Sequence, residues 1–150
     1  LLIIVFINFI DQNIARFFSD LLIIIPLTFL AYSFYVYRSD NNIGAIEAFL
    51  AGLFIDLISD SYFGLNAIIF CLITYVINSY ANAFKLFSYL QICLFFGLSS
   101  AAYVGFTQLV INLYNFSYLI LFVSAIVNII FCILIAAISI YLPRNVEMKI

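Results

Sequence analysis

The sequence contains no histidine, and only 8% of its 150 residues are charged, compared with about 25% in soluble domains. Without histidine, the chain can build neither a His-ligated metal site nor a Ser-His-Asp triad. Its five lysines and arginines and its net charge of -2 exclude a basic surface for nucleic acid, which needs clustered cations. These absences predict a protein that is not an enzyme, uses no cofactor or metal, and binds no nucleic acid.

Cysteine is also sparse, and no cysteines have the spacing of a metal or redox motif. The three cysteines lie inside apolar runs, at Cys71, Cys93 and Cys132. Without a CxxC pair or a Cys/His set they cannot form a zinc site. We interpret them as small apolar side chains of a core that lies in lipid.

Apolar side chains, in contrast, are abundant. Hydrophobic residues make up 68% of the chain, and its mean hydropathy is +1.28. A soluble protein with such a surface would aggregate, whereas lipid already solvates it. We therefore predict a single polytopic membrane domain over residues 1–150, in contact with membrane lipid.

Five apolar runs approach the roughly 20 residues that an α-helix needs to cross a bilayer. They are residues 21–37, 43–58, 62–80, 86–111 and 117–142. Residues 1–10 are also apolar, but ten helical residues span only about 15 Å, so we interpret them as a truncated first helix. Runs this continuous are typical of helices rather than of barrel strands. The sequence predicts an all-α integral membrane protein with six transmembrane helices, the second of them kinked at Pro26.

Lysine and arginine predict the orientation of this bundle. If the first helix starts in the cytoplasm, four cations lie on the inner side and only Arg16 lies outside. The inner cations are Arg38, Lys85, Arg144 and Lys149. Because cytoplasmic loops carry an excess of lysine and arginine, we predict that both termini are cytoplasmic.

Small residues recur every four positions in three predicted helices, which places each set on one helix face. The rows are Gly44, Ala48, Gly52 and Asp56, then Gly97, Ala101 and Gly105, then Ser124, Asn128, Cys132 and Ala136. In lipid, helices associate through close packing of small residues and through interhelical hydrogen bonds. The rows predict packing seams, and the sequence leaves open whether each seam lies within this bundle or meets another protein.

Two carboxylates, Asp56 and Asp60, lie at the end of the third predicted helix in an otherwise apolar stretch. The predicted topology places both near water at the outer surface, where a charge costs less than at the bilayer centre. We expect Asp56 to accept hydrogen bonds from Ser59, Asn66 or the backbone N–H groups that open the next helix. Asp60 is expected to be solvated, and Gly64 to adopt a positive φ in the turn.

The central stretch of the chain resembles the signature region of the family of bacterial rod shape-determining proteins MreD. It reads NIGAIEAFLAGLFIDLISDSYFGLNAI, residues 42–68. In that region a glycine-rich helix ends in G-x-x-x-D-L-x-S and is followed by a short turn and a glycine. The matching residues here are Gly52, Asp56, Leu57, Ser59 and Gly64. The preceding stretch SDLLIIIPLTFLAYSFYVYR is similar to the family's second helix.

The resemblance implies a six-helix inner-membrane protein whose fold is similar to that of the vitamin-binding S components of energy-coupling-factor transporters. It also implies a non-enzymatic partner of MreC, and through MreC of the actin-like MreB and of the glycosyltransferase and transpeptidase that insert sidewall peptidoglycan. A small-molecule-binding transport subunit is the alternative, since fold alone does not decide function. A deep pocket lined by convergent polar groups would favour that alternative, with Asn66, Asn78, Asn82 and Gln108 as candidate lining residues.

Overall fold

The computed structural model describes residues 2–18, 23–39, 43–59, 62–111 and 117–141. Every regular element in this part of the chain is an α-helix, which confirms the all-α prediction. The helices are α1 (Leu2–Phe18), α2 (Leu27–Arg38), α3 (Ala45–Ser59), α4 (Leu65–Ser79), α5 (Ala81–Phe84), α6 (Tyr89–Ile111) and α7 (Tyr118–Tyr141). Since α5 has only four residues, the other helices form the bundle.

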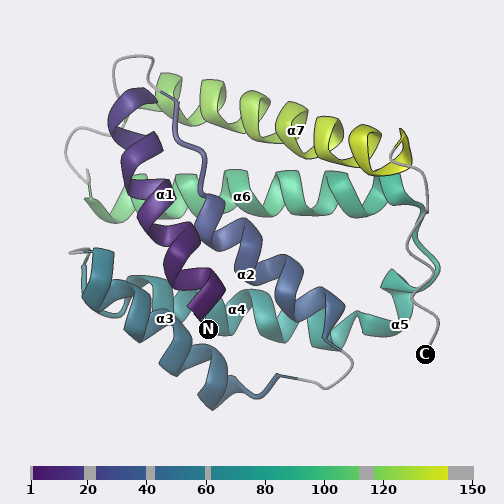
Figure 1. Ribbon diagram of the computed structural model, residues 1–150, viewed down its shortest axis with the longest axis horizontal. Helices are drawn as coiled ribbons and strands as arrows, with labels where there is room; N and C mark the ends of the chain where they lie inside the picture. Colours follow the sequence, from purple (N-terminus) through teal and green to yellow (C-terminus); the bar gives the residue numbers. More distant parts are fainter. Residues whose placement is uncertain (1, 19–22, 40–42, 60–61, 112–116, 142–150) are drawn as a thin grey trace.

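Two antiparallel helix pairs make up most of the bundle (Figure 1). α6 packs along α7 and α3 packs along α4, and these are the two most extensive helix contacts in the described residues. α2 contacts both pairs, through α4 and α6, while α1 packs on α2 and α3. Because α4 and α6 touch each other only briefly, the two pairs are joined mainly through α2.

Pro26 lies directly before α2 and not inside it, so the predicted kinked helix over residues 21–37 is wrong. Residues 23–26 are not helical, and Pro26 occupies the position that precedes the helix, with φ -82°. Proline is tolerated at a helix start, where its missing N–H removes no intrahelical bond. The backbone N–H of Thr28, in the first turn, donates to the Asp11 carboxylate at 2.9 Å.

α1 continues beyond the apolar fragment 1–10 and ends at Phe18, which corrects the predicted boundary. Polar residues that directly follow the fragment have hydrogen-bond partners for their side chains. Asp11 accepts a second hydrogen bond from the Thr28 hydroxyl at 2.7 Å, and Asn13 donates to the Phe9 carbonyl of its own helix at 2.8 Å. The polar end of α1 is therefore part of the packed bundle.

Aromatic side chains fill the space between α2 and α4. The rings of Tyr32 and Phe70 stack with centroids 3.9 Å apart. The Tyr32 hydroxyl also shares a 2.8 Å hydrogen bond with Thr74, so burying this phenol leaves no polar atom unpaired. This contact fixes the position of α2 on the α3–α4 pair.

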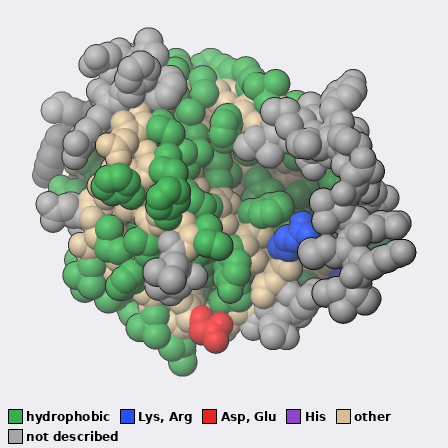
Figure 2. All heavy atoms as spheres, viewed as in Figure 1, with side chains coloured by type: hydrophobic (Ala, Val, Ile, Leu, Met, Phe, Trp, Pro, Cys, Tyr) green, Lys and Arg blue, Asp and Glu red, His purple; other side chains and the backbone are tan. Residues whose placement is uncertain are grey.

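The described surface is largely apolar, and Figure 2 shows hydrophobic side chains spread over one face, with an acidic group near its lower edge and a basic group to the right of its centre. Exposed large side chains on α3 alone include Ile46, Phe49, Leu50 and Leu57. Among the described helices, α6 is the one that is both long enough and apolar enough to cross a membrane. Shorter apolar stretches lie in α1, α4 and α7. Six membrane spans therefore stay a prediction.

Candidate functional site

At Gly52 the backbone of α3 closely approaches the backbone at the start of α4. Gly52 is buried, as is Ala48 one turn earlier. A Cβ atom added to Gly52 would lie 2.6 Å from both the backbone N of Ala67 and the backbone O of Asn66. Backbone atoms cannot rotate aside as a side chain can, so this position accommodates only glycine without moving a helix.

Asp56 lies one turn beyond Gly52 and is only 2% exposed. Its carboxylate accepts hydrogen bonds from the backbone N–H groups of Gly64 at 2.9 Å, Asn66 at 3.1 Å and Ala67 at 3.4 Å. The Asn66 side-chain amide donates a further bond at 2.8 Å. The first N–H groups of a helix have no intrahelical partner, and the helix dipole stabilises a negative charge beside them. Asp56 on α3 therefore caps α4, and Asn66 and the opening N–H groups are among the partners expected from the sequence.

The turn between α3 and α4 depends on Gly64. Its φ is 93° and its ψ is -8°, a left-handed conformation that glycine adopts without steric cost. Gly64 occupies the N-cap position of α4, yet it has no side chain that could accept a hydrogen bond. The acceptor for this helix start comes instead from the neighbouring helix, through Asp56.

Other residues of the predicted motif lie apart from the cap. Gly44, expected in the same row, precedes α3 and is exposed, and a Cβ there would meet no described atom within 4 Å. The row ends before Gly44 because the chain is still turning into the helix there, with the Gly44 N–H on the Glu47 carboxylate at 3.3 Å. Ser59 is half-buried and accepts a hydrogen bond from Asn8 at 2.9 Å. Asp60 lies outside the described residues.

Asn66 connects the cap to α6. Its side-chain oxygen accepts a hydrogen bond from the Tyr103 hydroxyl at 2.7 Å. The Tyr103 ring stacks on Phe29 of α2, with centroids 4.8 Å apart. The contacts that begin at Asp56 therefore reach α4 and α6 through hydrogen bonds and α2 through ring stacking.

A second group of polar contacts joins α1 to α2 and α3. The Asn8 amide donates to the hydroxyls of Thr28 at 3.3 Å and Ser59 at 2.9 Å. The Gln12 amide donates to the Asn8 side-chain oxygen at 3.2 Å and to the Ile58 carbonyl at 3.4 Å. α1 is thereby held by side-chain amides as well as by apolar packing.

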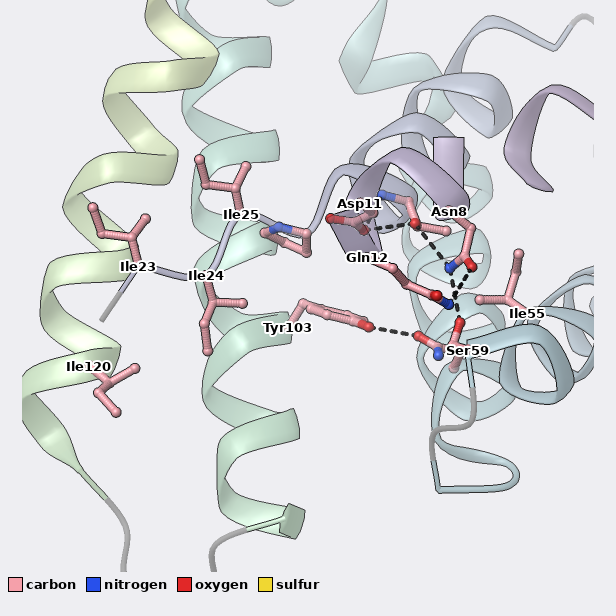
Figure 3. Close-up of a pocket in the computed structure, with 13 residues that line it drawn as sticks. Asn8, Asp11, Gln12, Ile23, Ile24, Ile25, Ile55, Ser59, Tyr103 and Ile120 are labelled. Atoms are coloured by element: carbon pink, nitrogen blue, oxygen red, sulfur yellow. Dashed lines mark hydrogen bonds between the residues drawn. The ribbon is translucent and has the colours of Figure 1, made fainter. Parts of the chain in front are cut away.

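These polar groups line one side of a partly open cavity of about 430 Å³. Its lining consists of Asn8, Asp11, Gln12, Ile23, Ile24, Ile25, Pro26, Thr28, Ile55, Ser59, Asn66, Tyr103 and Ile120. In Figure 3, Ile23, Ile24 and Ile120 lie on the side of α7, while the polar side chains of α1 gather on the other side with Ser59. The volume lies within the range of small-molecule sites, roughly 300–1,000 Å³.

The second predicted row lies between α6 and α7. A Cβ on Gly97 would lie 3.1 Å from the Cα of Ile129, and a Cβ on Gly105 would lie 2.8 Å from the Cδ1 of Leu121. Ala101, between them, is half-buried. In the structure this row faces α7 of the same chain.

Ser124 and Asn128 of the third row attach the non-helical stretch before α2 to α7. The Ile24 N–H donates to the Ser124 hydroxyl, and the Asn128 amide donates to the Ile24 carbonyl, both at 3.1 Å. Both side chains are fully buried. The sequence predicts bonds between helices, but the partner is the backbone of a non-helical stretch. Because Pro26 delays the start of α2, the backbone groups of Ile24 need acceptors and donors from elsewhere.

A smaller cavity of about 330 Å³ lies at the other end of α4. Arg38, from the end of α2, and Lys85, after α5, both line it. Asn78, a candidate for the polar cavity in the sequence, belongs to this end and donates to the Ile43 carbonyl at 2.9 Å. The two cations therefore share one end of the bundle, and the Asp56 cap lies at the other.

The sequence interpretation missed three residues of α1, namely Asn8, Asp11 and Gln12, because it treated the first helix as a lipid-embedded fragment. Their spacing of three and four positions places them on one helix face. Three polar residues on one face of an apolar helix indicate a buried polar contact, so the signal was present in the sequence.

The chemistry available to these groups is hydrogen bonding. In the described residues, no three His, Cys, Asp or Glu side chains are grouped so that they could hold a metal ion. The buried carboxylate of Asp56 and the half-buried carboxylate of Asp11 both accept hydrogen bonds at helix starts. The arrangement positions helices relative to one another.

An apolar surface, an all-helical bundle and buried polar groups that join helices together define the class of helical membrane proteins. Residues 1–143 match the family model of the rod shape-determining protein MreD, so the chain belongs to the MreD family. This match confirms the resemblance of the central stretch. No curated protein and no solved structure matches the chain. As a member of this family, the chain is a rod shape-determining membrane protein.

Proposed function

We propose that this chain is a non-enzymatic scaffold of the machinery that elongates rod-shaped bacteria. In this role it binds MreC, and through MreC it helps to organise MreB and the glycosyltransferase and transpeptidase of sidewall peptidoglycan synthesis. The family match over residues 1–143 carries the proposal. The use of Asp56 as a helix cap supports it, since the most deeply buried described carboxylate has a structural task.

A scaffold needs a fixed surface more than a reactive group. The contact of Gly52 with α4 and the cap by Asp56 fix the α3–α4 pair, and Asn66 with Tyr103 fixes it against α6. The exposed apolar faces of these helices are then held at set angles to one another. A partner helix in lipid recognises such a surface by shape, because lipid removes the hydrophobic drive for association.

We further propose one polytopic domain with six spans in the inner membrane and both termini in the cytoplasm. The shared cavity of Arg38 and Lys85 supports this orientation, since cations at one end favour the cytoplasmic side. In a variant without native cysteines, a cysteine at position 85 should react only from the cytoplasm. A cysteine at Tyr118, the exposed start of α7, should react only from outside. Reversed labelling would overturn the topology.

Depletion of the protein tests the scaffold function. Rod-shaped host cells should become spherical, and MreC should lose its organised distribution along the sidewall. Wild-type protein should co-purify with MreC from membranes. Cells that keep their rod shape after depletion, with no MreC in the purified material, would contradict the proposal.

The 430 Å³ cavity favours a second candidate function, small-molecule binding as in a transport subunit. The purified protein should then bind a vitamin at equilibrium, and depletion should produce a vitamin requirement while rod shape persists. The scaffold proposal predicts neither result. Measuring vitamin binding and MreC co-purification on the same preparation separates the two functions.

A further inference from the structure

The polar side of the cavity uses most of its own hydrogen-bond donors internally. Both hydrogens of the Asn8 amide go to hydroxyls, and both of the Gln12 amide go to Asn8 and a backbone carbonyl. The Thr28 hydroxyl donates to Asp11, and the Tyr103 hydroxyl donates to Asn66. A ligand that enters this side therefore meets few free donors.

Acceptor capacity, in contrast, remains. The two hydrogen bonds that Asp11 accepts from Thr28 end on the same oxygen, and a carboxylate accepts about four. The side-chain oxygen of Gln12 accepts no hydrogen bond from the described residues. No lysine or arginine is among the described residues that line the cavity. The complementary ligand group is therefore a cation with several N–H donors.

The other side of the cavity is apolar. Ile23, Ile24 and Ile120 line it, and Figure 3 shows them across from the polar side chains of α1. A small free cation would leave these side chains facing water. An amphipathic molecule would contact both sides, with its charged head at Asp11 and its apolar part along the isoleucines.

We propose that this cavity binds the primary ammonium group of an amphipathic amine, supplied by an aminophospholipid headgroup or by a free alkylamine. The ammonium donates hydrogen bonds to the carboxylate of Asp11 and the side-chain oxygen of Gln12. The proposal goes beyond the scaffold function. It does not depend on that function, because the cavity is present whether or not the chain binds MreC.

The test compares lipids that differ only in the number of N–H donors. Wild-type protein in nanodiscs is offered phosphatidylethanolamine, its N-monomethyl and N,N-dimethyl forms, and phosphatidylcholine, all with the same acyl chains. Native mass spectrometry then measures which lipid stays bound. Retention should fall stepwise as donors are lost, by about tenfold from the first lipid to the last. Equal retention of all four lipids would overturn the proposal.

Variants of single carboxylates place the selectivity at the cavity. Asp11→Asn should abolish the preference for phosphatidylethanolamine, whereas Glu47→Gln, an exposed carboxyl at the far end of α3, should keep it. Preference that survives Asp11→Asn in folded protein contradicts the assignment. Should Asp11→Asn fail to fold, because Asp11 also caps α2, the methylation series on wild-type protein decides alone. Octylamine that displaces the bound lipid identifies the free amine as a sufficient source, and octylamine without effect restricts the site to lipid.

Discussion

The α3–α4 pair and the α6–α7 pair are both built on glycines spaced for one helix face, yet the glycines meet different atoms. Gly52 faces the backbone of Ala67 and Asn66, whereas Gly105 faces the end of the Leu121 side chain. Beside the Gly52 contact, the buried carboxylate of Asp56 accepts hydrogen bonds from the start of α4. The Gly105 contact consists of apolar packing. Small-residue rows that look alike in a sequence therefore differ in how much change they tolerate.

The difference has a physical cause. A helix start carries backbone N–H groups without partners, and only a close approach lets a neighbouring carboxylate reach them. Gly52 provides that approach, and Asp56 uses it one turn later. α7 presents Ile129, near its middle, to Gly97 and the side chain of Leu121, in its first turn, to Gly105. The Leu121 N–H already donates to the Ser117 carbonyl at 3.3 Å, so this contact does not need an acceptor from α6. Packing is the whole of that interaction.

The largest effect is expected from Gly52→Leu. The added side chain has no space, and since backbone atoms face it, α3 and α4 must separate. Overpacking costs about 1–3 kcal/mol, and the separation also removes the hydrogen bonds of the Asp56 cap, so the total loss should exceed that of Asp56→Ala. The amount of folded protein in membranes and the MreC that co-purifies with it should both fall sharply. Gly44→Leu is the matched control, because Gly44 is exposed before α3. Similar losses in both variants would show that position 52 has no special contact.

Asp56→Ala should come next. It leaves three N–H groups at the start of α4 without their acceptor, at about 1–3 kcal/mol for each group that stays buried and unpaired. Unfolding in mixed micelles should show the loss of stability, and Asp56→Asn should recover part of it by keeping one acceptor oxygen. The control is Glu47→Ala, an exposed carboxyl with one 3.3 Å bond. If Asp56→Ala were as stable as the control, the Asp56 cap would make no contribution to the stability of the protein.

The α6–α7 pair should respond least. At Gly105→Ala the new methyl meets a flexible leucine end, so Leu121 can rotate and the cost should stay below about 1.5 kcal/mol. Gly97→Ala should cost more, because the nearest atom is the Cα of Ile129 at 3.1 Å. The same unfolding measurement ranks the two variants. A larger loss at Gly105 than at Gly52 would reverse the comparison between the two pairs.

Much of the central junction could be predicted from sequence because it is local. Asp56, Gly64 and Asn66 lie within eleven residues of one another, so a helix, a turn and a helix start determine their contacts. The turn glycine and the partners Asn66 and the opening N–H groups follow from general capping chemistry. Gly44 could not be predicted correctly, because the four-residue repeat in the sequence starts before the helix itself begins.

The cavity could not be predicted in the same way. Its lining comes from α1, α2 and the stretch before it, α3, α4, α6 and the start of α7, so it extends from residue 8 to residue 120 of the chain. Apolar composition also concealed the polar face of α1, and a proline inside an apolar run was interpreted as a kink when it marked a late helix start. The cavity depends on which segments meet, and a single sequence does not give that information.

The central claim is that Gly52 and Asp56 act as one device, in which close approach allows the cap. A double-mutant cycle with Gly52→Ala and Asp56→Ala tests it most directly, with stability measured by unfolding in mixed micelles. Once the added methyl has moved α4 away, removing the carboxylate should cost little more, so the cycle should give a coupling energy of about 1 kcal/mol or more. Losses that add to within about 0.5 kcal/mol would mean that the two residues act independently and would contradict the account.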